Sequence, residues 1–307
     1  MIPKHLSDLL GLNISGHADI DFVDVDTSTD TELFVDPCLI KISGDAMCVN
    51  AQRTIDSFFD KLYANYKSTA TGPEIDALLQ HLGERNEACM GYGNGRNGKG
   101  KTAEGMKDIL VDLHDLICKG IKMEHPIDLP LFLKKFDKDC MSDMLINILY
   151  KDFSEFTLGQ CRRYNINTEP LNAERYFWDA ATGSWQLYTG NCLRINGRVF
   201  IMVPKYIVRK GYYYNTSQYF NSMIATRIQA DRTEYIDGRK YAPNKQDIRE
   251  DEINTYGSLI QTARIHTEND PSYLADYHSN MSKAYSNRGM TDDELDAYIY
   301  GAKSETA

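Results

Sequence analysis

A glycine-rich stretch holds the residues whose types and spacing most resemble a chemical site. Residues 95–102 read GRNGKGKT and match the phosphate-loop pattern GxxxxGK[ST]. In such a loop, backbone N–H groups surround phosphate oxygens, the lysine contacts the terminal phosphate and the hydroxyl binds magnesium. The predicted ligand-binding residues are Gly95, Arg96, Gly98, Lys99, Gly100, Lys101 and Thr102.

The surroundings of this loop do not fit a conventional nucleotide hydrolase. Only the short apolar run 88–90 stands before Gly91, whereas a phosphate loop follows a buried apolar strand. The later strand at 199–203 ends in Pro204 and therefore offers no aspartate for magnesium. Three interpretations stay open: a nucleoside triphosphatase, a looser anion-binding loop, and a flexible surface loop.

Aspartates near the N-terminus are the second group of residues that could support chemistry. Residues 1–36 hold eight acidic side chains, with Lys4 as their one basic partner. Carboxylates gathered in this way repel one another unless water or a cation separates them. Asp26 and Asp36 are the most site-like, because each stands at the end of a predicted strand. The alternative is a solvated acidic face.

A polar stripe on a predicted apolar helix could complete a metal site. Asp139, Asp143 and Asn147 recur every four residues and therefore share one helix face. Oxygen ligands of this kind suit Mg²⁺ or Mn²⁺, which would polarise a phosphoryl oxygen and activate water. The alternative is helix capping by Asp139. The hypothetical metal ligands are Asp26, Asp36, Asp139 and Asp143, and the hypothetical catalytic residues are Asp36, Asp143 and Lys205.

Cations and aromatic rings alternate in a third segment. Lys205, Arg209 and Lys210 precede three consecutive tyrosines, 212–214. Such a pattern can bind a single nucleic-acid strand through phosphate contacts and base stacking. Tyrosines packed half-buried against the core would explain the same pattern.

Two apolar segments end in the same way and could meet. Residues 33–37 read LFVDP and residues 200–205 read FIMVPK. If these ends lie side by side, they direct Asp36 and Lys205 toward one place. The alternative is that they are unrelated strand ends, because proline commonly terminates a strand.

Helices and short strands must position these residues. We predict a helix-rich α/β or α+β fold with a small mixed sheet of short strands near residues 20–25, 32–36, 86–92, 185–193 and 198–203. Helices are predicted over residues 49–66, 73–82, 103–119, 139–161, 271–285 and 292–300, with a hairpin over 178–185. A main domain is assigned to 1–210 and a helical, tyrosine-rich region to 211–307, in which 231–252 is an exposed loop or linker.

The overall composition narrows the class of protein. A chain of 307 residues with 42% hydrophobic and 25% charged residues can bury a large core. The formal net charge of −10 argues against a general nucleic-acid coat protein but not against a local basic groove. We expect no membrane span and no signal peptide. Seven scattered cysteines without a CxxC motif indicate a reducing, cytoplasmic location.

Five motifs in this order resemble an uncharacterised family of bacterial proteins found among accessory and phage-defence genes. They are residues 22–27 (FVDVDT), 33–37 (LFVDP), the glycine loop after Met90, 139–147 (DCMSDMLIN) and 203–205 (VPK), within roughly residues 15–210. Longer family members add a C-terminal restriction-type nuclease domain. This sequence has no ExK motif for such a nuclease, and the relatives' loop does not require a lysine. The resemblance therefore implies a context and no mechanism.

Together these features predict a defence-associated protein that binds a phosphate-bearing ligand, either nucleic acid or nucleotide. It would act as a sensor or tether, with a protein partner from the same operon that does the cutting. The alternative is a metal-dependent phosphodiesterase or nuclease that uses the clustered aspartates. A third interpretation is a structural assembly subunit without a ligand, whose tyrosine-rich C-terminal helices form the interface.

Overall fold

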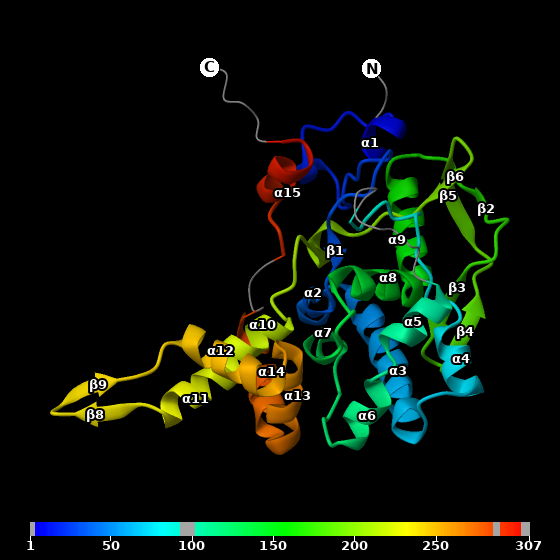
Figure 1. Ribbon diagram of the computed structural model, residues 1–307. Coiled ribbons are helices and arrows are strands. Elements are labelled where there is room, and N and C mark those ends of the chain that lie inside the picture. Colours follow the sequence, from blue (N-terminus) through cyan, green and yellow to red (C-terminus); the bar gives the residue numbers. More distant parts are fainter. Residues whose placement is uncertain (1–3, 93–101, 285–288, 302–307) are drawn as a thin grey trace, which may run out of the picture.

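Helix α3 (Ala46–Ser68) is the longest helix of the described chain, and one of its faces packs on the core (Figure 1). Its apolar residues Phe58, Phe59 and Leu62 recur at helical spacing and are buried on one face. Asp45 caps the first turn by accepting a hydrogen bond from a backbone N–H. The computed structural model describes residues 4–92, 102–284 and 289–301.

The other helices surround α3 or form the C-terminal part of the chain. Those before residue 165 are α1 (Leu6–Leu9), α2 (Pro37–Ile42), α4 (Pro73–Leu79), α5 (Ala103–Ile109), α6 (Leu113–Cys118), α7 (Leu129–Phe132), α8 (Lys138–Ile148) and α9 (Tyr150–Arg163). The later ones are α10 (Thr216–Tyr219), α11 (Ala225–Asp231), α12 (Lys245–Tyr256), α13 (Leu259–Asn269), α14 (Ser272–Ala284) and α15 (Asp292–Ile299). Short 3-10 turns lie at His17–Asp19, Pro126–Asp128 and Lys205–Ile207.

Two helices predicted as continuous are each divided in two. The segment 103–119 forms α5 and α6, and 139–161 forms α8 and α9. The second division falls at Leu149, whose φ of −95° and ψ of 20° leave the α-helical region. Residues 140–148 are buried on every side, whereas α9 keeps an exposed face. The turn at Leu149 thus lets α8 cross the core while α9 lies at its edge.

The strands form four small antiparallel sheets, which confirms a helix-rich α+β fold. The pairs are β1 (Phe34–Val35) with β7 (Val208–Arg209), β3 (Tyr176–Asp179) with β4 (Ser184–Leu187), and β8 (Glu234–Ile236) with β9 (Arg239–Tyr241). A three-stranded sheet has the order β2 (Glu169–Pro170), β5 (Asn191–Ile195) and β6 (Arg198–Phe200).

The segments 20–25 and 86–92 make single bridges and do not join a common sheet. Phe22 bridges to Pro204, and Met90 bridges to Thr31. The N–H of Val25 donates to the carbonyl of Val23 at 2.9 Å, a three-residue turn that removes it from a ladder. The strands predicted near 20–25 and 86–92 are therefore wrong, because tight local turns leave only isolated bridges there.

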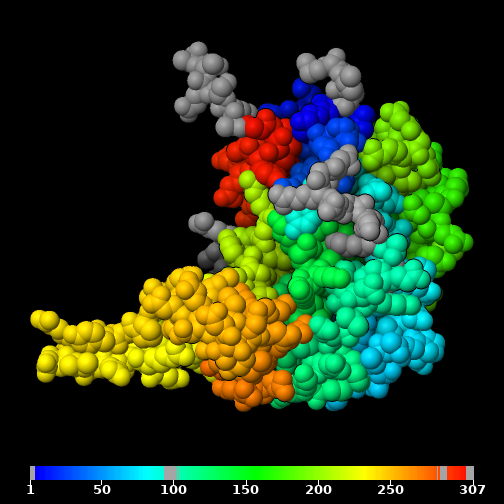
Figure 2. All heavy atoms as spheres, in the orientation of Figure 1, coloured from blue at the N-terminus to red at the C-terminus, as the bar shows by residue number. Residues whose placement is uncertain are grey.

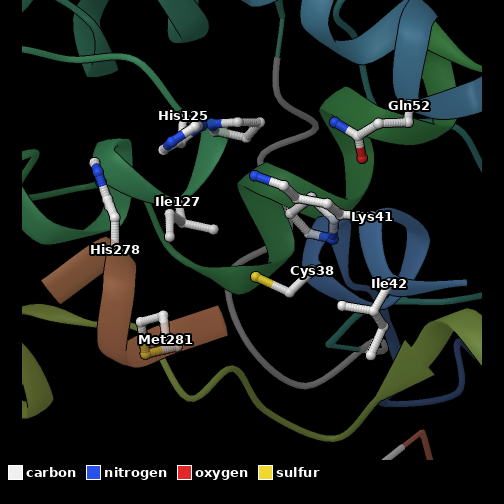
Figure 3. Close-up of a pocket in the computed structure, with 10 residues that line it drawn as sticks. Cys38, Lys41, Ile42, Gln52, His125, Ile127, His278 and Met281 are labelled. Atoms are coloured by element: carbon white, nitrogen blue, oxygen red, sulfur yellow. The ribbon is translucent and has the colours of Figure 1, made fainter. Parts of the chain in front are cut away.

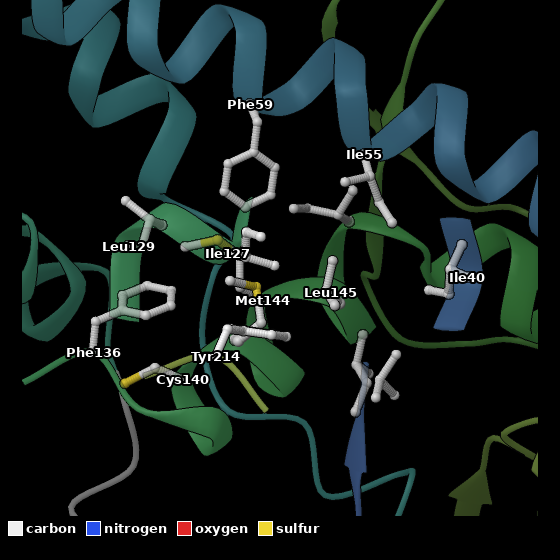
Figure 4. Packing of buried hydrophobic residues seen from close by; sticks show 14 of the residues in the cluster. Ile40, Ile55, Phe59, Ile127, Leu129, Phe136, Cys140, Met144, Leu145 and Tyr214 are labelled. Atoms are coloured by element: carbon white, nitrogen blue, oxygen red, sulfur yellow. The ribbon is translucent and has the colours of Figure 1, made fainter. Parts of the chain in front are cut away.

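One buried cluster continues across residue 210. Figure 4 shows Phe59 of α3 facing Met144 and Leu145 of α8, with Tyr214 nearby. The same cluster includes Tyr277 of α14. The tyrosine-rich C-terminal region therefore shares its core with the residues before it. Within the described part of the chain, no helix is long and apolar enough to cross a membrane.

Helix α15 returns to the N-terminal segment of the chain, as the red and blue surfaces of Figure 2 show. Asp296 accepts hydrogen bonds from the backbone N–H of His17 at 2.8 Å and from its Nδ1 at 2.6 Å. A Cβ at Gly16 would lie 2.2 Å from Asp296 Oδ2, so this close approach requires glycine. The 3-10 turn His17–Asp19 is thereby joined to the last helix of the described chain.

The charged segment 231–252 is not a linker, which corrects the prediction. It contains β8, β9 and the start of α12, and the hairpin projects from the body as an arm (Figures 1 and 2). Asp237 and Gly238 both have positive φ, 49° and 75°, as a two-residue hairpin turn requires. Tyr235 on this arm is 71% exposed. The exposure was predicted correctly, but the turn signal Asp-Gly was overlooked.

Replacing Phe58 by alanine should destabilise the fold by about 3–5 kcal/mol, because the ring is fully buried. Both tryptophans report on this position, since their rings lie 5.1 Å (Trp178) and 5.8 Å (Trp185) from the Phe58 ring. Urea denaturation followed by tryptophan fluorescence measures the change. The control Val111→Ala, at a side chain 65% exposed, should change stability by less than about 0.5 kcal/mol. Equal effects of the two variants would contradict this packing.

Candidate functional site

The two-residue ladder between β1 and β7 forms the floor of the candidate site. Phe34 lies directly opposite Arg209, so their side chains share one face of the ladder. The Lys138 ammonium lies 4.3 Å from the centre of the Phe34 ring. The Tyr92 ring packs against Phe34 at 5.3 Å, edge to face. Residues from four separate parts of the chain therefore meet on this floor.

Two hollows adjoin at Gly211, on the chain that leaves β7. One, of about 450 Å³, is lined by Arg209, Lys210 and Tyr213 together with residues of α15 and the segment before it. The other, of about 520 Å³, is lined by Lys138, Tyr212 and the segment 214–217. A Cβ at Gly211 would meet no atom within 4 Å, so the rim that the hollows share is open.

Cations lie against aromatic rings throughout these hollows. The Arg209 guanidinium lies 4.0 Å from the centre of the Tyr213 ring and donates to the Tyr213 hydroxyl at 2.9 Å. The Lys210 ammonium lies 3.6 Å from the centre of the Tyr298 ring. Rings hold cations in place without neutralising their charge. Tyr213 is 48% exposed, so much of its surface remains accessible to a ligand.

The acidic groups at the site have structural partners. Asp137 lines the second hollow and caps α8 by accepting a hydrogen bond from the Cys140 N–H at 3.0 Å. Glu294 lines the first hollow and accepts a hydrogen bond from the Thr291 N–H at 2.9 Å, as part of a capping box. Glu32 lies 3.6 Å from Lys138. The Lys138 ammonium also donates to the Lys210 carbonyl at 2.5 Å. The residues that line the hollows thus include three cations and two carboxylates, on a chain with a formal net charge of −10.

The two proline-ended segments do lie side by side, but Asp36 and Lys205 do not point to one place. The Asp36 N–H donates to the Ile207 carbonyl at 2.9 Å. The Asp36 side chain is fully buried, caps α2 through the Cys38 N–H at 2.8 Å and lies 3.4 Å from the Tyr214 hydroxyl. Lys205 instead bonds to the His17 carbonyl at 2.5 Å and to Asp292 of α15 at 2.6 Å.

The predicted metal ligands have different surroundings. Asp26 accepts hydrogen bonds from the Ser28 N–H and hydroxyl at 2.8 and 2.6 Å and lies 3.5 Å from Lys4. Asp139 and Asp143 lie on α8, where Asp143 is buried. Considering only residues 4–92, 102–284 and 289–301, no three His, Cys, Asp or Glu side chains are arranged to hold a metal ion.

The amide of the helix stripe has a structural role. Asn147 accepts a hydrogen bond from Arg85 Nε at 2.6 Å and donates to the carbonyls of Gly83 and Asp143 at 2.6 and 2.8 Å. Its oxygen and nitrogen are thereby engaged, which leaves it poorly suited as a metal ligand.

Two carboxylates do approach each other near the start of the glycine loop. Burial raises the pKa of Asp30, and the charge of Asp139 raises it further, while Arg198 lowers it. A Cβ at Gly91 would lie 3.0 Å from Asp139 Oδ1. Asp30 was not predicted as a site residue, because nothing in the sequence indicates that it faces α8.

The glycine loop itself lies largely outside the described residues. This applies to Gly95, Arg96, Gly98, Lys99, Gly100 and Lys101. Thr102 is described: it caps α5, and its hydroxyl accepts a hydrogen bond from the Gly105 N–H at 3.1 Å. The phosphate-loop interpretation stays a prediction. The chain reaches the loop from Tyr92, which packs on Phe34, on the floor of the hollows.

A family model described as a domain of unknown function, DUF8370, matches residues 11–215. The chain belongs to the DUF8370 family. No curated protein and no solved structure matches it. The DUF8370 region contains the whole floor of the site, Lys138, and the segment from Arg209 to Tyr214.

The wall that α15 contributes lies beyond the DUF8370 region. Tyr298 of α15 contacts Lys210 and donates a hydrogen bond to the Glu32 carbonyl at 3.1 Å. Sequence reasoning found the alternation of cations and tyrosines but missed Lys138 and Tyr298. The only signal for Lys138 was its place beside Asp139, and Tyr298 gave none.

Replacing Asp139 by asparagine should lower the pKa of Asp30, because it removes a nearby like charge. NMR titration of the side-chain carboxyl carbons measures this pKa. The folded-state pKa lies above the unfolded value near 3.8, so stability is lost as pH rises through this range. Asp139→Asn should therefore reduce that loss. An unchanged Asp30 titration would show that the two carboxylates are not neighbours.

Proposed function

We propose that this DUF8370 protein binds a phosphate-bearing ligand, nucleic acid or nucleotide, in the two hollows that meet at Gly211. The observation that carries the proposal is the grouping of Arg209 and Lys210 with the half-exposed ring of Tyr213. Cations attract phosphate oxygens, and an exposed ring offers a face on which a base can stack. Both kinds of contact are within one cavity of about 450 Å³.

The charge distribution favours an anionic ligand at this place. The chain carries a formal net charge of −10, so its general surface repels phosphates. Lys138, Arg209 and Lys210 line two adjoining hollows, together with two carboxylates, Glu294 and Asp137. A ligand with several phosphates could contact both hollows across the open rim at Gly211. Binding would then be local and specific, in contrast to the diffuse attraction of a basic coat protein.

The glycine loop would add to the same site. Tyr92, the last described residue before it, packs on Phe34, which is paired with Arg209. The loop's Arg96, Lys99 and Lys101 follow within nine residues of Tyr92. Since consecutive residues are at most about 3.6 Å apart along the chain, the loop's cations are within reach of a ligand in the hollows.

In the defence context that the resemblance implies, binding would serve as a sensing or tethering step. The proposal assigns cleavage to a protein partner encoded in the same operon, since the chain has no ExK motif. A metal-dependent hydrolase is not favoured by the described geometry. Asp36 is buried as a helix cap, and Lys205 is paired with Asp292.

The double variant Lys210→Gln/Tyr213→Ala should weaken binding at least about tenfold, because it removes one cation and one stacking ring. Fluorescence anisotropy with a labelled oligothymidylate and a labelled ATP analogue measures the affinity. The matched control is Lys240→Gln/Tyr235→Ala, which removes the same groups from the opposite pair on the β8–β9 arm. Loss of binding in the control alone, equal loss in both, or no binding by the parent would refute the proposal.

Gly211→Leu should block the shared rim without removing a charge. The space beside Gly211 is empty, so the leucine side chain can enter it without a clash and occupy the place of a ligand. The loop variant Lys99→Ala/Lys101→Ala should also weaken binding of the same ligand. If Gly211→Leu binds like the parent, the hollows are not the site. If only the loop variant loses affinity, binding depends on the loop and the hollows have no part in it.

A further inference from the structure

A separate cavity of about 280 Å³ lies between α2, α3, the turn at Pro126–Asp128 and α14 (Figure 3). Its walls are mainly apolar, with Ile42, Ile127 and Met281 among them. At about 30 Å³ for each water in the liquid, the space corresponds to roughly nine waters. It therefore suits a small organic molecule, and it shares no residue with the hollows at Gly211.

Polar groups in this cavity include one cation and one unused acceptor. Lys41 lines the cavity. Burial lowers the pKa of His125, and the charge of Lys41 contributes in the same direction. Figure 3 shows the Lys41 amine on the side of the cavity where His125 and Gln52 lie. No aspartate or glutamate is among the described residues that line it. The charge of Lys41 thus has no opposing carboxylate within the cavity wall.

Gln52 supplies the acceptor. Its Nε2 donates to Asp56 at 2.7 Å, which fixes which end of the amide is which, because a carboxylate only accepts. Its Oε1 is buried and has no hydrogen-bond partner in the part of the chain that the structure describes. A buried acceptor without a donor is unfavourable. A ligand with a hydroxyl or N–H group would satisfy it.

Two histidines complete the polar side and are held by one buried carboxylate. Asp128 is fully buried and accepts hydrogen bonds from the His278 ring at Nε2 (2.6 Å) and from the backbone N–H of His125 (2.8 Å). The imidazole rings lie 4.5 Å apart. Burial lowers the pKa of His125, so its ring is neutral at pH 7 and offers one N–H donor. Lys41 thus provides the charge and His125 a neutral donor.

We propose that this cavity binds a small apolar 2-hydroxy acid. The carboxylate would be held by Lys41 and His125, the hydroxyl would donate to Gln52, and the apolar body would pack against Ile42, Ile127 and Met281. Each part of the ligand has a partner in the wall: the Lys41 cation, the Gln52 acceptor without a donor among the described residues, and the apolar surface. This site does not depend on phosphate binding at Gly211.

Mandelate is the probe, because it combines a phenyl ring, a hydroxyl and a carboxylate in a small molecule. Titration calorimetry of the full chain should show binding. Phenylacetate, which lacks the hydroxyl, and methyl mandelate, which lacks the charge, should each bind at least about tenfold more weakly. A parent protein that does not bind mandelate, or binds either comparator equally well, would overturn the proposal.

Variants test whether the binding occurs in this cavity. Lys41→Met should weaken mandelate binding at least about tenfold, and Ile42→Trp should abolish it by filling the space. Ile42 is 44% exposed, so the larger ring can be accepted without unfolding the chain. Val49→Trp is the matched control, at a side chain 43% exposed that does not line the cavity. Parent-like binding by Ile42→Trp, or equal loss in both tryptophan variants, would place the ligand elsewhere.

Discussion

The fold depends on how the buried backbone of β1 finds hydrogen-bond partners. This strand has only two residues, and both side chains are fully buried, so unpaired peptide groups there would be costly. The Val35 N–H donates to the Ser142 hydroxyl of α8 at 3.1 Å. The Val35 carbonyl accepts from the Tyr212 hydroxyl. Side chains from distant parts of the sequence therefore complete a ladder too short to stabilise itself.

This requirement fixes the geometry around the candidate site. Ser142 draws α8 against β1, which places Lys138, one turn earlier, over the Phe34 ring. Tyr212 must turn inward to reach Val35, and Tyr214 packs parallel to it at 4.7 Å. Tyr213, between them, is left at the surface beside Arg209. The alternation of inward and outward tyrosines thus follows from a backbone constraint, and it leaves the Tyr213 ring exposed beside the first hollow.

Sequence patterns predicted the helices and strands better than they predicted which side chains bond to one another. Helical spacing located α3, α4, α14 and α15, and the glycine between two tryptophans located the β3–β4 hairpin. The stripe of α8 was correctly placed on one helix face. Its residues serve structure more than predicted, because Asn147 bonds to Arg85 and Gly83. Partners more than sixty residues away in the chain leave no local pattern, so spacing alone could not reveal these bonds.

In the acidic N-terminal segment, too, the sequence did not reveal the hydrogen-bond partners. Asp8 accepts hydrogen bonds from the N–H groups of Lys4 and His5, and Asp24 accepts from Ser7 and from the Tyr300 hydroxyl. The backbone hydrogen bonds from His5 and Lys4 hold the pKa of Asp8 below its ordinary value. The ionised Asp8 therefore stabilises the folded state at pH values above its ordinary pKa, and this stabilisation is lost as the pH falls through the lowered pKa.

The pKa of Asp30 is shifted in the opposite direction, because burial and the charge of Asp139 raise it. A cluster that looks uniform in sequence therefore divides in the structure. Asp8 and Asp24 organise the chain as hydrogen-bond acceptors, whereas Asp30 is destabilised beside Asp139. Removing the charge of either Asp30 or Asp139 would relieve the repulsion between them, because a like charge disfavours the ionised carboxylate. That pair lies beside Gly91, where the chain enters the glycine loop.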